Sequence, residues 1–384
     1  MEDNLNKQVV NLNDSIITEF AKMADNKKEC LKLTYGQPNY NTPDVIKESL
    51  IESLNNNRTR YENASGNTDL IKKIIIHEKI YNNLDYSFDE ILITSGATDA
   101  IYIALNTMIN KNDEVIIPCP YYPEYIPVVN KLEGKVILYN NKNYNYLLDN
   151  DSLEKLINYR TKCIILTSPN NPTGTMLNEK SLNIAYELVK KHKIFLLIDS
   201  CYEKIIYDKM PSYSIFNEIK NYILFCHSFS KTYAMTGWRL GYLTGPKYFI
   251  QNAIKLHQYL NVSITTFVQD AGIKALTYDP INELNFLKNN MEYAYNRLIE
   301  MNLEVSKPNG AFFLFPSIKK YNIDSYTFCK RIMDEMNVAL VPGIAFGADD
   351  NIRISFCVEF DILKEALDRL EIFISKLEKE LSNW

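Results

Sequence analysis

The sequence predicts an α/β fold with a mostly parallel central sheet flanked by helices, together with a smaller α+β domain. Three observations lead to this prediction. Short β-branched apolar runs alternate with helical patterns through the first two-thirds of the chain. Polar motifs follow the ends of these runs, which is where ligands bind in parallel sheets. After about residue 280 the alternation gives way to a long helix and short strands.

The expected strands of the central sheet each lead into a polar loop. They are the apolar runs 91–93, 115–117, 163–167, 194–198 and 222–226. Helices are expected over 99–109 and around Leu182, Tyr186 and Val189, which form an apolar stripe at helical spacing. We therefore expect a large domain over 45–280. The small domain is expected over 1–44 and 281–384, with short strands near 310–316 and 338–341.

Composition narrows the class of protein. The chain has 384 residues, of which 46% are hydrophobic, and a net charge of -5, which argues against a nucleic-acid partner. No apolar run approaches the length of a membrane span, and the polar start at 1–4 does not resemble a signal peptide. The seven dispersed cysteines indicate reduced thiols and a cytoplasmic protein. The four histidines lie far apart along the chain, so no metal site is expected.

The most informative motif is the segment 228–242, which contains Ser228, Lys231 and Arg239. A lysine held among hydroxyl residues after an apolar run can be an amine nucleophile toward an aldehyde. The hydroxyls and the arginine can together hold a phosphate. An aldehyde and a phosphate on one small molecule describe pyridoxal 5′-phosphate (PLP). The alternative is a solvated loop lysine, so the interpretation depends on the rest of the chain.

Three polar residues suit the ring of such a cofactor. Asp199 closes the apolar strand 194–198 and would pair with a protonated pyridine nitrogen, although a turn or helix-cap residue is the alternative. Asn171, in the turn-like segment 168–174, and Tyr202 offer an amide and a phenol as hydrogen-bond partners for the ring's phenolate oxygen. We expect these three side chains to meet at the carboxyl edge of the sheet.

Further candidates are weaker when each is taken alone. The turn Gly96–Thr98 before a helix would let backbone N–H groups approach a phosphate, but a plain capped helix start fits equally well. Tyr122 is either a core aromatic or a ring stacked on the cofactor. Arg353 alternates with apolar residues on a strand, so it is a solvated arginine by default, or a bidentate clamp for a substrate carboxylate.

Together these motifs resemble the class I/II aminotransferases, the PLP enzymes of the aspartate-aminotransferase superfamily (fold type I). The resemblance runs from the segment 33–38 to Arg353 and is strongest over 168–174, 199–202 and 228–242. It implies a PLP-dependent aminotransferase that moves an amino group from an L-amino acid to a 2-oxo acid by a ping-pong mechanism. It also implies a homodimer with both active sites at the interface.

The resemblance assigns roles to individual residues. Lys231 is similar to the Schiff-base lysine, and Asp199 and Tyr202 to its catalytic partners at the ring nitrogen and ring oxygen. Tyr61 is similar to the tyrosine that reaches the phosphate of the neighbouring subunit. The resemblance implies cofactor contacts from Gly96, Ala97, Thr98, Tyr122, Asn171, Asp199, Tyr202, Ser228, Lys231, Arg239 and Tyr61, and substrate contacts from Gly36, Asn171 and Arg353.

The chain departs from the family pattern in two places. Some members place a histidine behind the pyridine-pairing aspartate, where this chain has Tyr125, so the support of Asp199 should differ. No second arginine is recognisable for a side-chain carboxylate, which leaves dicarboxylic substrates open but unsupported. The amino donor is not predicted.

Three other functions compete with transamination. A PLP-dependent C–S β-lyase would share the fold and the lysine. A transcription regulator with an aminotransferase-like sensor would need a DNA-binding module, and only about 30 residues precede Leu31. A nicotinamide enzyme ranks last because no Gly-x-Gly-x-x-Gly follows a strand.

Overall fold

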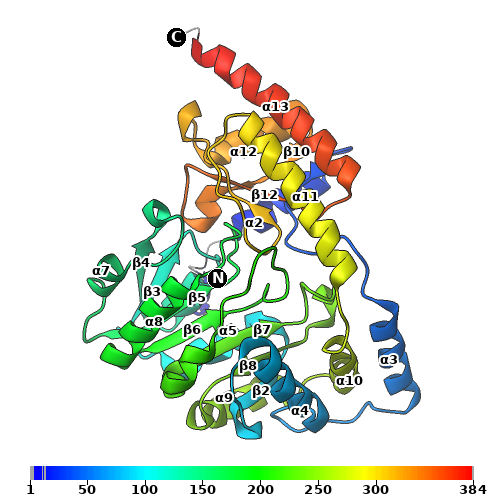
Figure 1. The fold of residues 1–384 in the computed structure, drawn as a ribbon, viewed down its shortest axis with the longest axis vertical. Helices are drawn as coiled ribbons and strands as arrows, with labels where there is room; N and C mark the ends of the chain where they lie inside the picture. The colour runs from blue at the N-terminus through cyan, green and yellow to red at the C-terminus, as the bar shows by residue number, and fades with distance from the viewer. Residues whose placement is uncertain (1–3, 11, 13, 383–384) are drawn as a thin grey trace.

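The computed structural model describes residues 4–10, 12 and 14–382. The polar start at 1–3, which entered the targeting argument, lies outside these residues. Figure 1 shows the central sheet with its helices in one part of the molecule and the C-terminal helices gathered in another. None of the helices in the described ranges combines the length and apolar character needed to cross a membrane.

The central sheet confirms the predicted α/β class. Within the described residues its order is β2-β8-β7-β6-β5-β3-β4. Strands β4, β3, β5, β6 and β7 are parallel to their neighbours in this series. Strand β8 is antiparallel to both of its neighbours, β2 and β7. The strands are β2 (Ile91–Thr94), β3 (Glu114–Cys119), β4 (Lys135–Asn140), β5 (Thr161–Thr167), β6 (Phe195–Asp199), β7 (Ile223–Ser228) and β8 (Gly241–Thr244).

Strand β8 lies inside the motif that sequence reasoning assigned to phosphate binding, and it was not predicted as a strand. Its first residue explains how it fits beside β7. A side chain at Gly241 would place its Cβ 2.5 Å from the carbonyl oxygen of His227 on β7, so only glycine allows this approach. β4 was also not predicted, although residues 136–139 form an uninterrupted apolar run.

Helices cover both faces of the sheet, as Figure 1 shows. Along β5, Ile164 and Leu166 pack into one core while Cys163 and Ile165 pack into the other, because successive side chains of a strand point to opposite faces. The helices of the first three-quarters of the chain are α1 (Lys7–Val10), α2 (Ile16–Asp25), α3 (Asp44–Asn55), α4 (Thr68–His77), α5 (Gly96–Met108), α6 (Tyr125–Lys131), α7 (Asn150–Glu154), α8 (Glu179–His192), α9 (Lys247–Asn261) and α10 (Thr266–Ala275).

A separate core forms from the two ends of the chain. Phe20 and Leu33 from the N-terminal segment pack with Leu287, Phe328 and other residues of the C-terminal helices. These helices are α11 (Ile281–Glu300), α12 (Ser325–Met336) and α13 (Phe360–Ser382), and the short strands are β1 (Leu31–Lys32), β9 (Phe313–Leu314), β10 (Val338–Ala339), β11 (Val341–Pro342) and β12 (Ile352–Ser355). The domain limits at 44/45 and 280/281 stay a prediction.

Candidate active site

The loops after the parallel strands meet around a cavity of about 250 Å³. Eleven of the predicted site residues line it, and they come from segments as distant as Gly36 and Arg353. These residues are Gly36, Ala97, Thr98, Tyr122, Asn171, Asp199, Tyr202, Ser228, Lys231, Arg239 and Arg353. Strands β5, β6 and β7 are parallel, so their carboxyl ends open at one edge of the sheet and deliver these side chains to the same place.

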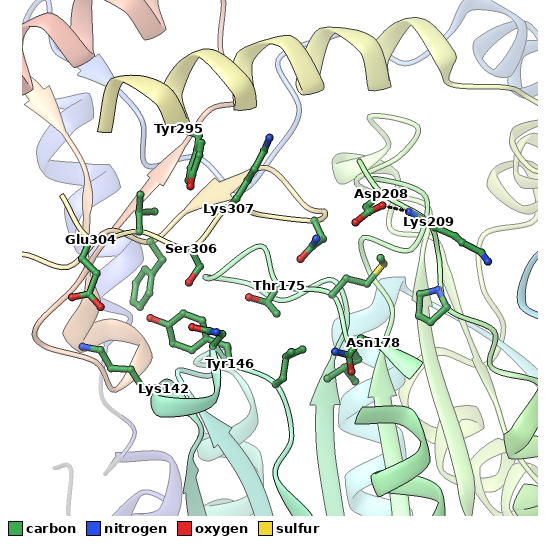
Figure 2. Close-up of a pocket in the computed structure, with 18 of the residues that line it drawn as sticks. Lys142, Tyr146, Thr175, Asn178, Asp208, Lys209, Tyr295, Glu304, Ser306 and Lys307 are labelled. Carbon is green, nitrogen blue, oxygen red and sulfur yellow. Dashed lines mark hydrogen bonds between the residues drawn. The ribbon is translucent and has the colours of Figure 1, made fainter. Parts of the chain in front are cut away.

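A larger cavity of about 780 Å³ contains none of these residues (Figure 2). Its labelled residues come from both parts of the chain, for example Tyr146 and Thr175 on one side and Tyr295 and Lys307 on the other. The acidic and basic groups around it are mixed: Glu179, Asp208 and Glu304 line it together with Lys142, Lys209 and Lys307. Volume therefore does not identify the functional site here; the convergence of polar groups in the smaller cavity does.

Lys231 lies on the loop after β7, and its amine is enclosed by the cavity. Its Nζ donates a hydrogen bond of 2.6 Å to the carbonyl oxygen of Gly36. Burial lowers the pKa of this amine, and the positive charges of Arg353 and Arg239 lower the pKa further. A larger fraction of the amine is therefore neutral, which is the form that attacks a carbonyl carbon or accepts a proton.

Asp199 ends β6 and is held from two directions. The hydroxyl of Tyr125 donates to its Oδ2 at 2.6 Å, and the backbone N–H of Cys201 donates to its Oδ1 at 3.1 Å. Tyr125 also contacts the hydroxyl of Thr167 at 2.7 Å. Burial and the neighbouring Asp199 carboxylate raise the pKa of Tyr125, so this phenol stays a hydrogen-bond donor. Tyr125 thus supplies the support of Asp199 at the position where the sequence analysis expected that support to differ.

Arg353 is buried on β12, with 1% of its surface exposed, which corrects the default expectation of a solvated arginine. Its guanidinium stacks on the rings of Phe313 and Phe346, at 4.4 and 5.0 Å from their centroids. Nη1 donates to the side-chain oxygen of Asn171 at 3.1 Å, and Nη2 donates to the carbonyl of Thr34 at 2.7 Å.

The guanidinium of Arg353 keeps unused binding capacity. Its Nε is buried and has no hydrogen-bond partner within the described part of the chain. Burial lowers its pKa to about 10, which still leaves it charged at neutral pH. An unpartnered buried donor next to a cavity is costly unless a ligand pairs with it. A carboxylate suits this planar fork.

Arg239 and the start of α5 form a second cationic corner. Arg239 adopts a left-handed backbone conformation with φ 55°, and its Nη2 donates to the carbonyl of Ser95 at 3.2 Å. Gly96 has φ +80°, and a Cβ there would lie 2.6 Å from Nη2 of Arg239. The sequence interpretation of Gly96–Thr98 as a turn is corrected, because these residues begin the helix. Free N–H groups of a helix start next to an arginine suit a phosphate.

The two tyrosines predicted to contact the cofactor ring come from different segments of the chain, and both line the cavity. Tyr202 is buried against the rings of Phe312 and Phe313, and burial raises the pKa of its phenol, which keeps it protonated. Tyr122 packs edge-on against Tyr125, with ring centroids 5.7 Å apart. Both residues therefore present a rigid aromatic ring and a neutral hydroxyl to the cavity.

Sequence reasoning missed several residues that line the cavity. Glu124 accepts a hydrogen bond of 3.0 Å from the hydroxyl of Thr98. It lies two residues after Tyr122, and this closeness in sequence could have identified it as a cavity residue. Ser15, Ile17 and Thr18 approach from the start of α2, and no motif marks them. Only the tertiary fold brings this N-terminal helix to the cavity.

Two predicted site residues do not line the cavity: Gly96, which directly precedes the lining residue Ala97, and Tyr61, which lies away from it. Tyr61 is 84% exposed and lines a separate surface depression with Arg60 and Ser263. Within one chain it therefore cannot contact the other site residues. The expected contact across a dimer interface stays a prediction.

Comparison with known proteins gives consistent results. Residues 28–370 match the family model described as aminotransferase class I and II. The chain is 35% identical to a probable N-acetyl-LL-diaminopimelate aminotransferase of Bacillus subtilis, over 98% of this chain and 97% of that protein. It is 33% identical to aromatic-amino-acid aminotransferase 2 of Thermococcus litoralis, over 94% and 95% of the two chains. The crystal structure of an aspartate aminotransferase from Thermotoga maritima superposes with a TM-score of 0.92 at 29% identity, over 97% and 100% of the two chains.

Proposed function

The chain belongs to the class I and II aminotransferases, and on that premise we propose that the cavity around Lys231 is its active site. Members of this family are PLP-dependent enzymes, and this chain is a PLP-dependent transaminase that transfers an amino group from an amino acid to a 2-oxo acid. The observation that carries the site proposal is the convergence of Lys231, Asp199 and Arg353 on one cavity.

The residues of the cavity fit the cofactor. The start of α5, Ser228 and Arg239 would hold its phosphate, since they place N–H groups, a hydroxyl and a cation together. Asp199, fixed by Tyr125, would pair with the ring nitrogen, and Tyr202 would donate to the ring oxygen. Bound in this way, PLP supplies an electron sink for the bond broken at the substrate's Cα.

Lys231 has two roles in this proposal. Its amine would hold the cofactor through the aldehyde carbon and, once freed by an incoming amino acid, would take the proton from the substrate's Cα. Its lowered pKa favours the neutral amine that both roles require. The 2.6 Å hydrogen bond to the carbonyl of Gly36 shows that this amine reaches the wall of the cavity on the side of the N-terminal segment.

Arg353 and Asn171 would bind the carboxylate attached to the substrate's Cα. The Nε of Arg353 is unpartnered, and Asn171, whose side-chain oxygen accepts from Nη1, keeps its amide N–H groups as donors, so the two side chains offer donors for a carboxylate. Rings of Phe313 and Phe346 hold the guanidinium plane, which limits how the substrate turns about this contact.

We propose that the substrate side chain carries no second carboxylate. The cations that line the cavity in the described ranges are Lys231, Arg239 and Arg353, and each has a role above. Glu124 adds a negative charge beside Thr98. A dicarboxylic donor such as aspartate would meet this repulsion, whereas a neutral or aromatic side chain would not.

The remaining expectations belong to the same proposal. We infer a homodimer in which Tyr61 serves the partner's site, because Tyr61 is exposed and lies outside its own cavity. A cytoplasmic location is supported by seven cysteines that are all free. A large domain over 45–280 and a small domain over 1–44 and 281–384 are supported by the separate core that the two chain ends form.

Reductive trapping tests the site assignment. Borohydride treatment of the PLP-loaded protein, followed by proteolysis and mass spectrometry, should place a pyridoxyl group on the peptide that contains Lys231. A label on another lysine, or no label, would contradict the assignment. A panel of amino donors with a 2-oxo acid acceptor then tests the substrate proposal. Pyruvate and ammonia released from an S-substituted cysteine without any acceptor would instead indicate the β-lyase.

A further inference from the structure

A second polar cluster is buried next to the segments that carry Tyr202 and Ser228, two residues of the cavity around Lys231 (the cofactor cavity), and has no role in the proposed reaction. We call it the His77 cluster; its members are His77, Glu78, Asn82, Glu203 and His227. His77 ends α4, and Glu78 and Asn82 lie on the π-helical segment Glu78–Asn82 that continues it. Each member is at least nine-tenths buried. Buried charged groups of this kind need partners that compensate the loss of water.

Part of the cluster is well paired. Nδ1 of His227 lies 2.8 Å from Oε2 of Glu203. Glu78 accepts hydrogen bonds from the hydroxyl of Tyr242 at 2.7 Å and from the side-chain amide of Asn82 at 2.9 Å. These contacts occupy one oxygen of Glu203 and orient both carboxylates. They leave the other oxygen of Glu203 directed at His77.

Three members of the cluster have a buried polar atom without a hydrogen-bond partner within the described residues: Oδ1 of Asn82, Nε2 of His227 and Nε2 of His77. The Nε2 of His77 lies 3.5 Å from Oε1 of Glu203. The side chain is held in place by stacking on Tyr81, with ring centroids 5.3 Å apart. At 3.5 Å, the contact between the imidazole nitrogen and the carboxylate is a poor hydrogen bond.

The same distances suit ligands of one metal ion. Ligand atoms of His77, Glu78 and Glu203 all lie within 4.8 Å of one another. Two ligand atoms about 2.0–2.1 Å from a tetrahedral zinc ion lie roughly 3.4 Å apart, close to the spacing between His77 and Glu203. One imidazole and two carboxylates are a ligand set for a divalent first-row cation.

The charge of the cluster also favours a bound cation. Two carboxylates are buried together, with ring nitrogens of His227 at 2.8 Å from Glu203 and 3.7 Å from Glu78. The nearby ammonium of Lys204 donates to the hydroxyl of Tyr233 at 2.8 Å. A divalent cation would neutralise both carboxylates while His77 remains neutral. His227, bonded to Glu203, would then act as the partner that orients a metal-bound carboxylate.

We propose that His77, Glu78 and Glu203 bind a structural divalent transition-metal ion, with Zn²⁺ as the ion used to test it. The site would fasten the end of α4 to the loop after β6. Glu203 follows Tyr202 directly, and His227 precedes Ser228, so the ion would also brace two segments of the cofactor cavity. The proposal differs from the sequence analysis, which expected no metal site because the four histidines lie far apart along the chain.

The test uses the intact PLP-loaded protein, produced in zinc-supplemented medium and dialysed against EDTA. Elemental analysis should find about one zinc per chain. X-ray absorption at the zinc edge should show nitrogen and oxygen ligands at about 2.0 Å, and no sulfur at about 2.3 Å. The absence of sulfur separates this site from zinc picked up by the free cysteines. Metal well below one per chain, or sulfur ligation, would overturn the proposal.

Two variants sharpen the test. His77→Gln should lose the bound zinc, whereas His192→Gln should keep it, because His192 pairs with Glu154 at 2.8 Å in a partly exposed position. Stoichiometric zinc retained by His77→Gln would refute the ligand assignment. If His77→Gln does not fold, the metal content and absorption spectrum of the unaltered protein decide the question alone.

Discussion

The cofactor cavity and the His77 cluster are two polar centres built from adjacent segments, yet they differ in what surrounds the charges. In the cavity, Lys231 is enclosed with the cations Arg353 and Arg239, which oppose its protonation. Lys204, beside the cluster, is partly buried, and the carboxylates of Glu203 and Glu78 favour its protonation. Burial lowers the pKa of both amines; near Lys231 two guanidinium groups lower the pKa further, against the opposite effect of Glu124, whereas the charges near Lys204 are carboxylates that raise it.

In both centres a tyrosine hydroxyl donates to a carboxylate, but the two carboxylates serve different purposes. Tyr125 donates to Asp199 at 2.6 Å next to an open cavity, and Tyr242 donates to Glu78 at 2.7 Å in a closed core. A carboxylate fixed at a cavity can pair with a ligand, whereas one fixed in the core can serve only the fold or a buried ion. The predictions below test this distinction.

The largest effect is expected for the two lysines. Lys231→Ala should lower the rate of transamination by about 10³-fold or more, because it removes the general base. Lys204→Ala should leave the rate within about tenfold, since that amine contacts Tyr233 and not the cavity. Steady-state kinetics of both PLP-loaded variants checks this. Equal losses would end the distinction between the two lysines.

The carboxylate clamp should come next. Arg353→Lys replaces the planar fork that stacks on Phe313 and Phe346 with a point charge. We expect kcat/KM for the amino donor to fall by about 10- to 100-fold, mainly through KM, because hydrogen bonds to charged groups are worth about 1.5–3 kcal/mol. An unchanged KM would show that the substrate carboxylate binds elsewhere.

The paired tyrosines should separate catalysis from stability. Tyr125→Phe removes the donor to Asp199 and should lower kcat by about tenfold, with a shift in the pH dependence of cofactor absorbance. Tyr242→Phe removes the donor to Glu78 and should chiefly lower the free energy of unfolding, by about 1–3 kcal/mol. Denaturation and kinetics of both variants check this, and the reverse pattern would refute it.

The charge at the mouth of the cavity gives a smaller effect. Glu124→Gln removes the negative charge beside Thr98 and should raise kcat/KM for aspartate by several-fold, roughly 1 kcal/mol of relieved repulsion. Glu179→Gln, at the larger cavity, is the matched control and should change nothing. If aspartate already is the preferred donor of the unaltered enzyme, the substrate proposal is wrong.

The smallest effect concerns the cofactor-free protein. The pKa of Lys231 lies below its ordinary value of 10.5, so above the lowered pKa the unfolded chain binds more protons at this amine than the folded chain does. The contribution of Lys231 to the unfolding free energy therefore rises with pH up to about 10.5. Lys231→Met should stabilise the cofactor-free protein by on the order of 1 kcal/mol near neutral pH, and less as the pH rises. Urea denaturation across this range measures it; a gain that grows with pH would contradict the sign.

Much of the cofactor cavity could be predicted because its residues occur in contiguous motifs at strand ends. Lys231, Asp199 and Asn171 each follow an apolar run, and parallel strands must open at a common edge. Strand β8 escaped prediction because its Gly241 and Tyr242 belong to the phosphate motif and carry no alternating pattern. Glu124 and the start of α2 escaped because their contacts with the cavity depend on packing between distant segments.

The sequence by itself determined the α/β class, five of the seven strands of the central sheet and the chemistry offered at their ends, since periodicity and residue type are local properties. The tertiary structure alone decided that Arg353 is buried on aromatic rings, that Tyr125 fixes Asp199, and that His77 meets Glu203. These facts depend on which faces pack together, and close packing of distant segments leaves no periodic trace in the sequence.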